Sequence, residues 1–192
     1  ERSLPRALEK TAGVWIQETN MGGGAPVIRG LLGSQILILV DGIRINDSTT
    51  RLGPNQSLNT IDPAIVERVE ILRGSASVLY GSDAIGGVIS IWTRRRRAES
   101  QDPEEYWRCY QGAADIAYDT GCDGTRGDLD LSAAYGDHGI IAILGGFDYG
   151  DYEAGDEKTV PFTGYNGQGI FGAYEYALGK GQTVRLTGRA HR

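Results

Sequence analysis

Few side chains in this sequence stand at spacings that would support catalysis or metal binding. Met21-Gly22-Gly23-Gly24 has the glycine content of a phosphate-binding loop, but no Lys-Ser/Thr pair and no helix follow it. His138 and His191 have no cysteine or second histidine at a zinc-ligand spacing. Ser82-Asp83 lacks a nearby base that would activate the hydroxyl. We therefore expect no catalytic residue, no metal site and no cofactor, and a protein that is not an enzyme.

Charged side chains recur beside apolar segments in the first half of the chain. Ionised groups next to buried strands must be paired at least in part, because an isolated buried charge is very costly. The residues concerned are Arg29, Arg44, Glu67, Arg68, Glu70 and Arg73. We interpret them as ion pairs that maintain the fold and not as groups that recognise a ligand.

Three pairs that contain glycine mark sharp turns or close packing. Asp41-Gly42 and Arg73-Gly74 each end a strand-like segment, and glycine permits the chain to turn sharply there. Gly86-Gly87 is expected to let a turn pack closely against its neighbours, without a role in phosphate binding.

The composition divides the chain into two parts with different surroundings. Of the 192 residues, 40% are hydrophobic and 29 are glycine, and the net charge is −6. Residues 1–97 carry net charge +3, whereas residues 98–192 carry −9. Such asymmetry argues against nucleic acid as a partner of the second part. No apolar run reaches the roughly 18 residues of a transmembrane helix. The chain shows no basic, then apolar, then small-residue pattern of a secretion leader.

The elements that must position these residues follow from the pattern of residues 1–93. Residues 3–12 predict a short helix capped by Ser3, with Leu4 and Leu8 on one face. Residues 21–26 predict a loop and residues 47–60 a long exposed loop. Asp62 is expected to cap a short helix, and residues 76–80 a helical turn. Strands are predicted over residues 14–18, 27–29, 35–40, 43–46, 68–72 and 88–92, the third of them buried on both faces.

The second part shows apolar residues at every other position. The alternating sets are Tyr110 to Tyr118; Leu129, Leu131, Ala133 and Tyr135; Ile141, Ile143, Gly145, Phe147 and Tyr149; Ile170 to Leu178; and Val184 to Gly188. Segments of about 9–11 residues can cross a bilayer as tilted strands. Tight turns at 136–139 and 179–182 alternate with longer connections at 119–127 and 150–166, which is typical of a membrane barrel. A soluble antiparallel meander with one buried face would show the same alternation.

Three runs in the first part resemble the plug domain of TonB-dependent outer-membrane receptors. The runs are Ile36-Leu-Ile-Leu-Val-Asp41-Gly42-Ile-Arg44-Ile-Asn46, Ile61 to Gly74, and Leu79-Tyr80-Gly81-Ser-Asp-Ala-Ile-Gly86-Gly87 to Ile91, and Val27-Ile-Arg29-Gly30 fits upstream of them. The resemblance covers nearly all of residues 4–93. It implies an α+β plug, with a small mixed sheet and short helices, over residues 1–93. A linker at 94–105 and the first five or so antiparallel transmembrane β-barrel strands at 106–192 would follow.

The resemblance also implies a topology and a function. The plug of this family lies inside a barrel of about 22 strands. Because the barrel strands follow the plug and the linker along the chain, the first strand should run outward. The loops at 119–127 and 150–166 would then be extracellular, with Tyr118, Tyr135 and Tyr149 in an interfacial girdle. The implied function is TonB-dependent, energy-coupled uptake of a scarce nutrient such as an iron–siderophore, haem or cobalamin. The implied location is the outer membrane of a Gram-negative bacterium.

The partners implied by the resemblance are the TonB energy-transducing complex, outer-membrane lipid and a small metal-chelate or cofactor-like ligand. Ligand contacts are expected from residues 21–26 and from the loop at 47–60, above all Asn46, Thr49, Arg51, Asn55 and Gln56. The segment that would contact TonB and most of the barrel lie outside this sequence, so we expect an incomplete receptor. The alternative is a non-transporting fragment that contains the plug, either a binding or signalling piece or the product of a disrupted gene.

The two cysteines provide a check on the strand assignment. From the sequence alone, Cys109 and Cys122 could pair in an oxidising compartment or both remain thiols. The expected first strand lies between them and would span roughly 30 Å, which is far beyond disulfide reach. We therefore predict that no disulfide joins them.

Overall fold

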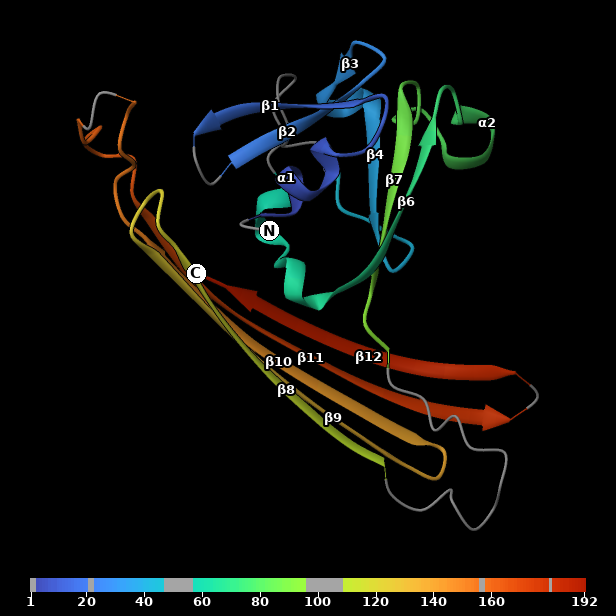
Figure 1. Ribbon diagram of the computed structural model, residues 1–192. Helices are drawn as coiled ribbons and strands as arrows, with labels where there is room; N and C mark the ends of the chain where they lie inside the picture. The colour runs from blue at the N-terminus through green and yellow to red at the C-terminus, as the bar shows by residue number, and fades with distance from the viewer. Residues whose placement is uncertain (1–2, 21–22, 47–56, 96–108, 156–157, 180) are drawn as a thin grey trace. The chain divides into compact units, whose positions relative to one another are not determined.

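The computed structural model describes residues 3–20, 23–46, 57–95, 109–155, 158–179 and 181–192. The chain divides into two compact units, Glu1–Thr93 and Arg94–Arg192. Figure 1 shows helices and short strands in the first unit and long strands in the second. The predicted α+β unit followed by antiparallel strands is confirmed. Most of the predicted linker at 94–105 lies outside the described residues.

The first unit begins with a helix and a three-stranded sheet. Helix α1 (Leu4–Glu9) is followed by strands β1 (Val14–Asn20), β2 (Gly23–Ile28) and β3 (Leu31–Leu32), paired in that order. Leu4 and Leu8 are both buried, as their spacing predicted. Ser3 occupies the N-cap position, but its side chain makes no capping hydrogen bond.

The predicted loop at 21–26 is wrong over its described part. Residues from Gly23 onward belong to β2 and pair antiparallel with β1, with Ile16 opposite Pro26. A Cβ at position 24 would lie 2.4 Å from Cγ2 of Ile16. Glycine is therefore required at Gly24 by close packing, and its presence does not mark a loop at that place.

A mixed four-stranded sheet completes the first unit. Its strands are β4 (Ile36–Val40), β5 (Ile43–Arg44), β6 (Val66–Arg73) and β7 (Gly87–Thr93), in the order β5-β4-β7-β6. The central strands β4 and β7 are parallel, and the other pairs are antiparallel. The run Ile36 to Leu39 is buried throughout, as a strand covered on both faces requires. Its core partners are Ala76, Ala84 and Val88.

Short helical turns connect these strands. They are η1 (Gly33–Gln35), η2 (Ser57–Thr60), η3 (Pro63–Ile65) and α2 (Ser77–Tyr80). The Asp62 side chain accepts a hydrogen bond of 2.9 Å from the Ala64 N–H and so caps η3 as predicted. Among the described residues, no helix combines the length and the apolar character that crossing a membrane requires.

The second unit is a five-stranded antiparallel meander. Its strands are β8 (Cys109–Asp119), β9 (Gly124–Tyr135), β10 (His138–Tyr149), β11 (Tyr165–Gly179) and β12 (Gln182–His191), and each pairs with the next along the chain. The whole of β8 therefore separates Cys109 from the turn that holds Cys122. The structure forms no disulfide at Cys122, in agreement with the prediction.

The connection between β8 and β9 is shorter than predicted. The loop expected at 119–127 spans only residues 120–123, because Asp119 pairs with Gly124 at the ends of the two strands. The carboxylate of Asp119 accepts a hydrogen bond from the Gly121 N–H and closes the turn. Polar residues 124–127 indicated a loop, but they continue the ladder. The connection at 150–164 remains the longest in this unit outside the paired strands.

Candidate functional site

The five-stranded sheet has one face that is almost entirely apolar. Residues directly opposite each other in neighbouring strands share a face. One such row across the sheet joins Tyr110, Ala133, Ile140, Tyr174 and Leu186. Further rows on this apolar face contain Ala114, Ile116, Leu129, Leu131, Ala142, Leu144, Ile170 and Ala190.

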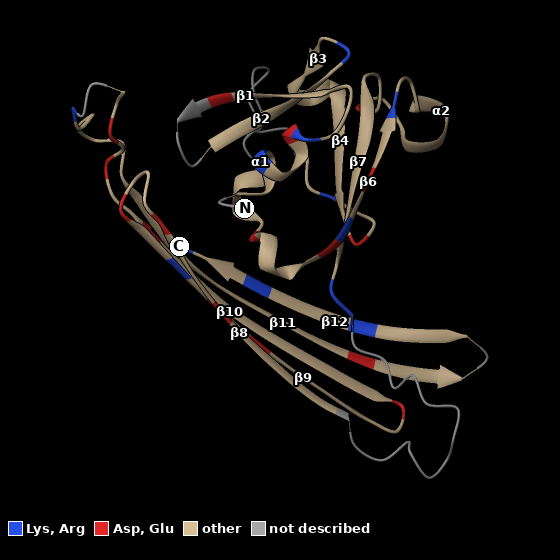
Figure 2. Ribbon diagram, in the orientation of Figure 1, with Lys and Arg blue, Asp and Glu red and all other residues tan. Residues whose placement is uncertain are grey.

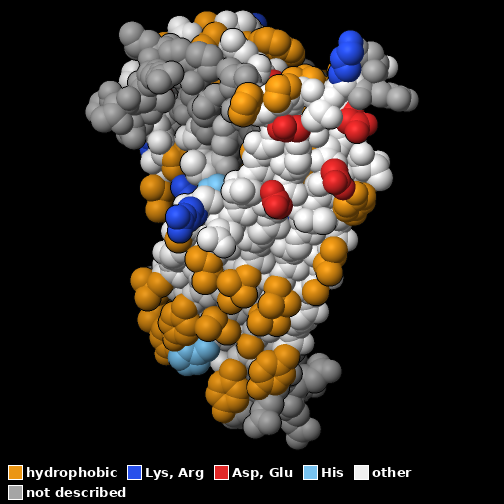
Figure 3. Space-filling view, turned by 90° about the vertical axis from the view of Figure 1, so that its left-hand side faces the viewer, with side chains coloured by type: hydrophobic (Ala, Val, Ile, Leu, Met, Phe, Trp, Pro, Cys, Tyr) orange, Lys and Arg blue, Asp and Glu red, His pale blue; other side chains and the backbone are white. Residues whose placement is uncertain are grey.

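Large side chains on the apolar face are open to the surroundings. Leu131 is 48% exposed, Ile140 54% and Ile170 53%. Figure 3 shows hydrophobic side chains gathered in a broad band across the sheet, with acidic side chains toward one end. A continuous exposed apolar surface of this kind marks an interaction with an apolar medium or partner.

Aromatic side chains flank the band, but the predicted girdle needs correction. Tyr118 and Tyr135 lie on the apolar face near opposite ends of the strands and are 61% and 52% exposed. Tyr149 lies on the other face and is buried. At the Tyr135 end, the Nδ1 atom of His138 lies 2.7 Å from the Tyr174 hydroxyl. Tyrosine and histidine present an apolar body and a polar tip, which suits an interface between apolar and aqueous surroundings.

The opposite face of the sheet is mixed in character and includes apolar residues of β10. Ile141, Ile143 and Tyr149 form one alternating set in the sequence, but alternation does not say which face of the sheet the set occupies. The register pairs Leu131 with Ala142, so Ile141 and Ile143 point to the face opposite Leu131, where they are buried. Strand β10 is apolar on both faces, and alternation alone therefore did not reveal its orientation.

Ion pairs link several charged residues on this polar face. Arg126 Nε lies 2.7 Å from Asp128 Oδ2, and Arg185 Nε lies 3.1 Å from Glu175 Oε1. Figure 2 shows that charges are sparse along these strands and that β11 and β12 carry opposite charges near each other. The Glu175–Arg185 pair is nearly excluded from solvent, with side-chain exposures of 6% and 13%. The sequence analysis missed this pair. Counting from the turn at Gly179 and Gln182 would have placed Leu186 opposite Glu175, because the register shifts between Ala177 and Gly179.

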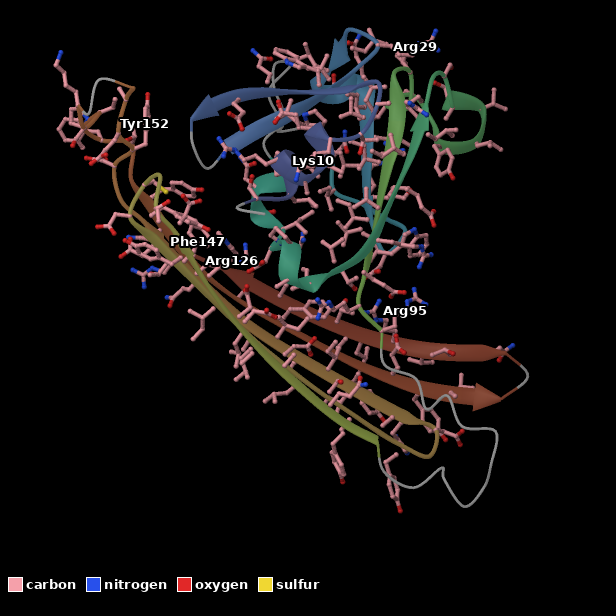
Figure 4. All side chains as sticks on the ribbon, in the orientation of Figure 1. Lys10, Arg29, Arg95, Arg126, Phe147 and Tyr152 are labelled. Atoms are coloured by element: carbon pink, nitrogen blue, oxygen red, sulfur yellow. The ribbon has the colours of Figure 1, made fainter. Side chains whose placement is uncertain are left out.

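Three aromatic rings line the polar face near the long connection. Phe147, Tyr149 and Tyr165 have ring centroids 5.1–5.5 Å apart. The rings lie over glycines of neighbouring strands: a Cβ at Gly124 would be 2.1 Å from Tyr149 and one at Gly167 would be 2.6 Å from Phe147. Figure 4 shows Phe147 close to Arg126, its cross-strand neighbour. The rings therefore pack along the sheet surface in places where any other residue would collide with them.

In the first unit, the Asp41-Gly42 turn has the geometry that its sequence predicted. Both residues have positive φ, 50° and 82°, as a two-residue hairpin turn requires. The Asp41 carboxylate also reaches the end of β7, where it accepts hydrogen bonds from the N–H and the hydroxyl of Thr93 at 2.9 and 2.6 Å. Thr93 is 1% exposed. Sequence reasoning gave Asp41 only a role in the turn and missed this second one.

Glycines after β6 and before β7 have the expected close contacts. A Cβ at Gly87 would lie 2.5 Å from the Leu72 carbonyl oxygen, and one at Gly86 would lie 2.8 Å from Leu31 Cβ. Gly74 has φ of 114°, which allows the turn after Arg73. The predicted role of Gly86-Gly87 in close packing is therefore confirmed.

The charged residues of the first unit pair at the surface and not in the core. Arg68 bonds Glu70 at 2.9 Å, approaches Glu67 at 3.7 Å and stacks on Trp92. The hydrogen bond from Arg68 lowers the pKa of Glu70, and a hydrogen bond from Trp92 adds to the effect. These side chains are about half exposed, so solvent screens the pairs and they contribute little to stability.

Two further arginines of the motifs, Arg44 and Arg73, bind main-chain or acidic groups. Arg44 bonds Asp83 at 2.8 Å and donates to the Tyr80 carbonyl at 2.9 Å. The same guanidinium lies beside Gly81. Arg73 donates to the carbonyl of Ala12, which lies 61 residues earlier in the chain. Arg29 and Gly30 form the β2–β3 turn with positive φ, 55° and 82°.

Of the five residues expected to contact a ligand, only Asn46 lies within the described residues. Its Oδ1 accepts a hydrogen bond from the Ile38 N–H and its Nδ2 donates to the Ile36 carbonyl, both at 2.8 Å. The amide thus takes the place of a neighbouring strand beside β4. Thr49, Arg51, Asn55 and Gln56 lie outside the described residues, and ligand contact by all five stays a prediction.

The connection between β10 and β11 is closed by one carboxylate. Asp151 Oδ1 accepts hydrogen bonds of 2.7 Å from the N–H groups of Gly164 and Thr163. These bonds, that from Gly164 foremost, hold the pKa of Asp151 below its ordinary value of 3.8. Thr163 in turn accepts from the Tyr152 N–H at 3.1 Å. One ionised side chain therefore ties the two ends of this connection together.

We expect the closure of this connection to persist to unusually low pH. Because the pKa of Asp151 is lowered in the folded state, its stabilising effect is fully present above the ordinary aspartate pKa. It is lost only as pH falls through the lowered value. The protection of the Thr163 and Gly164 amides from hydrogen exchange, relative to an unfolded chain at the same pH, should stay high at pH 5 and fall only below about pH 4. In Asp151→Asn, protection should be lower than in the unchanged protein at pH 5, and equal protection of the two proteins at that pH would contradict this account.

A plug-like α+β unit followed by antiparallel strands with one exposed apolar face is the order of parts that the resemblance to TonB-dependent receptors predicts. Residues 1–88 match the family model described as the TonB-dependent receptor plug domain. These residues belong to that family, and the chain is such a plug followed by barrel-type strands. It is 31% identical over 181 residues to the vitamin B12 transporter BtuB of Vibrio vulnificus, covering 92% of this chain.

Solved structures of similar fold include proteins named as transporters and receptors. The copper transporter OprC matches with a TM-score of 0.82 at 19% identity, over 98% of this chain and 28% of OprC. The Serratia marcescens hemophore receptor HasR, in complex with its hemophore HasA and heme, matches with a TM-score of 0.79 at 20% identity, over 100% of this chain and 29% of HasR. The chain also spans only 27% of the length of the Vibrio BtuB.

Proposed function

We propose that the protein containing this chain is a TonB-dependent outer-membrane receptor that takes up a scarce nutrient by energy-coupled transport. The observation that carries the proposal is the plug-domain match over residues 1–88. The exposed apolar face of the β8–β12 sheet supports it, because barrel strands that cross a bilayer present such a face to lipid. The relatives are named as transporters and receptors, which agrees with a protein that is not an enzyme.

The proposed nutrient is a bulky metal chelate or cofactor-like molecule of the iron–siderophore, haem or cobalamin type. The relatives carry names that include vitamin B12, copper and heme, so their names do not select one ligand. The proposed partners are the TonB energy-transducing complex, outer-membrane lipid and this ligand. The proposed location is the outer membrane of a Gram-negative bacterium.

Uptake by the intact protein tests this function directly. The full-length gene would be expressed in a Gram-negative host that lacks its own receptors, in tonB-positive and tonB-negative backgrounds. We expect accumulation of one radiolabelled ligand among cobalamin, haem and ferric siderophores, and its loss without TonB. Uptake that proceeds equally in both backgrounds would contradict energy coupling. Retention of the full-length protein in a soluble fraction would contradict the outer-membrane location.

Ligand binding by the same full-length protein can test two of the five predicted ligand contacts, Arg51 and Asn55. Arg51→Ala and Asn55→Ala should raise the ligand concentration needed for half-maximal binding, because each removes a polar group that the bound ligand would otherwise pair with. Glu67→Ala serves as the control, because Glu67 is an exposed residue of the plug outside the predicted loop at 47–60. This variant should bind the ligand as the unchanged protein does. If all three variants bind alike, these residues are not ligand contacts.

A further inference from the structure

Four charged residues of the second unit form a connected cluster on the polar face of the sheet. The Arg94 guanidinium contacts the Asp130 carboxylate of β9. Arg185 of β12 donates from Nη2 to the Arg94 carbonyl at 2.8 Å, and its Nε lies 3.1 Å from Glu175 of β11. We call Arg94, Asp130, Glu175 and Arg185 the junction cluster. Its charges balance, two of each sign, as groups removed from water require.

The parts of the junction cluster differ in exposure, and this suggests different tasks. Arg94 and Asp130 have side-chain exposures of 43% and 22%, so their pair alone contributes little. Glu175 and Arg185 are nearly buried. The carboxylate of Glu175 therefore orients the Arg185 guanidinium, whose planar fork can bind Glu175 and the Arg94 carbonyl at the same time.

The residue immediately before Arg94 is held just as firmly within the first unit. Both carboxylate oxygens of Asp41 accept hydrogen bonds from Thr93, one from its N–H and one from its hydroxyl. The Asp41 N–H in turn donates to the Ile91 carbonyl at 2.9 Å. Two consecutive residues are thus each fastened to their own unit, and no unattached residue lies between the two attachments.

We propose that Asp130, Glu175 and Arg185 are positioning residues that hold Arg94 on the strands of the second unit, whereas Asp41 holds Thr93 within the first. The first residue after the plug's last strand is then fixed on the sheet that follows it. Its place at the start of a barrel wall rests on the proposed function. The attachment itself depends only on the hydrogen bonds and ion pairs within each unit.

The attachment can be tested on the full-length protein with a spin label at position 95. The exposed Arg95 would be replaced by cysteine and labelled, in a background with Cys109→Ser and Cys122→Ala. We expect an immobilised spectrum in the otherwise unchanged protein. Asp130→Arg should lose the immobilised component, because it sets two like charges against each other. The exchanged pair Arg94→Asp with Asp130→Arg should regain it, because the opposite charges meet again.

Arg185→Lys provides a second test that keeps the charge at position 185. Lysine can pair with Glu175, but its single ammonium cannot reproduce the fork that also binds the Arg94 carbonyl. The label should therefore become mobile although the barrel stays folded, as judged by its heat-modifiable migration on gels. A label that stays immobile in both Asp130→Arg and Arg185→Lys overturns the proposal. So does an exchanged pair that fails to restore the immobilised component in a folded protein.

The two proposals fail in distinguishable ways. Ligand uptake would be measured on the same variants in tonB-positive cells. If the labels respond as expected and no ligand is taken up even by the unchanged protein, the attachment holds and the proposed function fails. If uptake is present and the label never responds, the attachment fails while the function holds.

Discussion

Leu131→Arg is expected to destabilise the folded protein in a bilayer, by lowering its free energy of unfolding by about 2–4 kcal/mol. Leu131 lies in the middle row of the apolar face, between the rows that contain Ile140 and Ile170, and is 48% exposed. If this face meets lipid, the guanidinium would be placed in the hydrocarbon layer near its midplane. Urea titration of the full-length protein in lipid vesicles, followed by tryptophan fluorescence, would measure the loss.

Ser132→Arg is the matched control for this change. Ser132 is the next residue of β9, so its side chain points to the polar face, and the substitution adds the same group at the same depth. It should cost much less, because that face already carries charged residues such as Asp130 and Arg126. Equal destabilisation by the two arginines would contradict a lipid-facing assignment of the apolar face and would favour a soluble sheet.

Glu175→Ala is expected to destabilise the protein by about 3–5 kcal/mol. The change removes one member of a nearly buried pair and leaves the Arg185 guanidinium without its carboxylate at 3.1 Å. The cost of an uncompensated buried charge exceeds the value of the pair itself. Thermal or denaturant unfolding of the full-length protein in detergent would report the difference.

Two comparisons decide whether this cost comes from burial of the pair. Replacing both partners, Glu175→Leu with Arg185→Leu, should restore most of the stability, because no charge is then left buried. Glu67→Ala removes an exposed carboxylate from the pair with Arg68 and should change stability by about 0–1 kcal/mol. If Glu175→Ala behaves like Glu67→Ala, water reaches the pair and our account of its burial is wrong.

Much of the fold could be predicted because local chemistry and global structure agree. Asp41-Gly42 predicted a hairpin turn, and the structure has positive φ at both residues. The apolar run at Ile36 to Leu39 predicted a strand buried on both faces. Gly86-Gly87 predicted close packing, and a Cβ at Gly87 would collide with a main-chain oxygen. In each case the requirement arises within a few residues and can be recognised there.

The errors occurred where two local patterns have the same appearance. Glycine-rich residues from Gly23 suggested a loop, yet a glycine is needed wherever a neighbour approaches closely, as Ile16 approaches Gly24 in β2. The polar residues 124–127 suggested a loop although they continue β9. Strand β10 is apolar on both faces, so its alternation did not show that Ile141 and Tyr149 point away from the exposed band.

The sequence by itself determined the class of protein, the order of its parts and the strands of both units, because turns, periodicity and motifs are properties of neighbouring residues. Only the tertiary structure decided which side chains meet across the sheets. The register placed Glu175 opposite Arg185. The end of β7 brought Thr93 to Asp41, and the middle of β9 brought Asp130 to Arg94. A shift of one residue in register would send each strand side chain to the other face, and no local pattern excludes that shift in a strand such as β10.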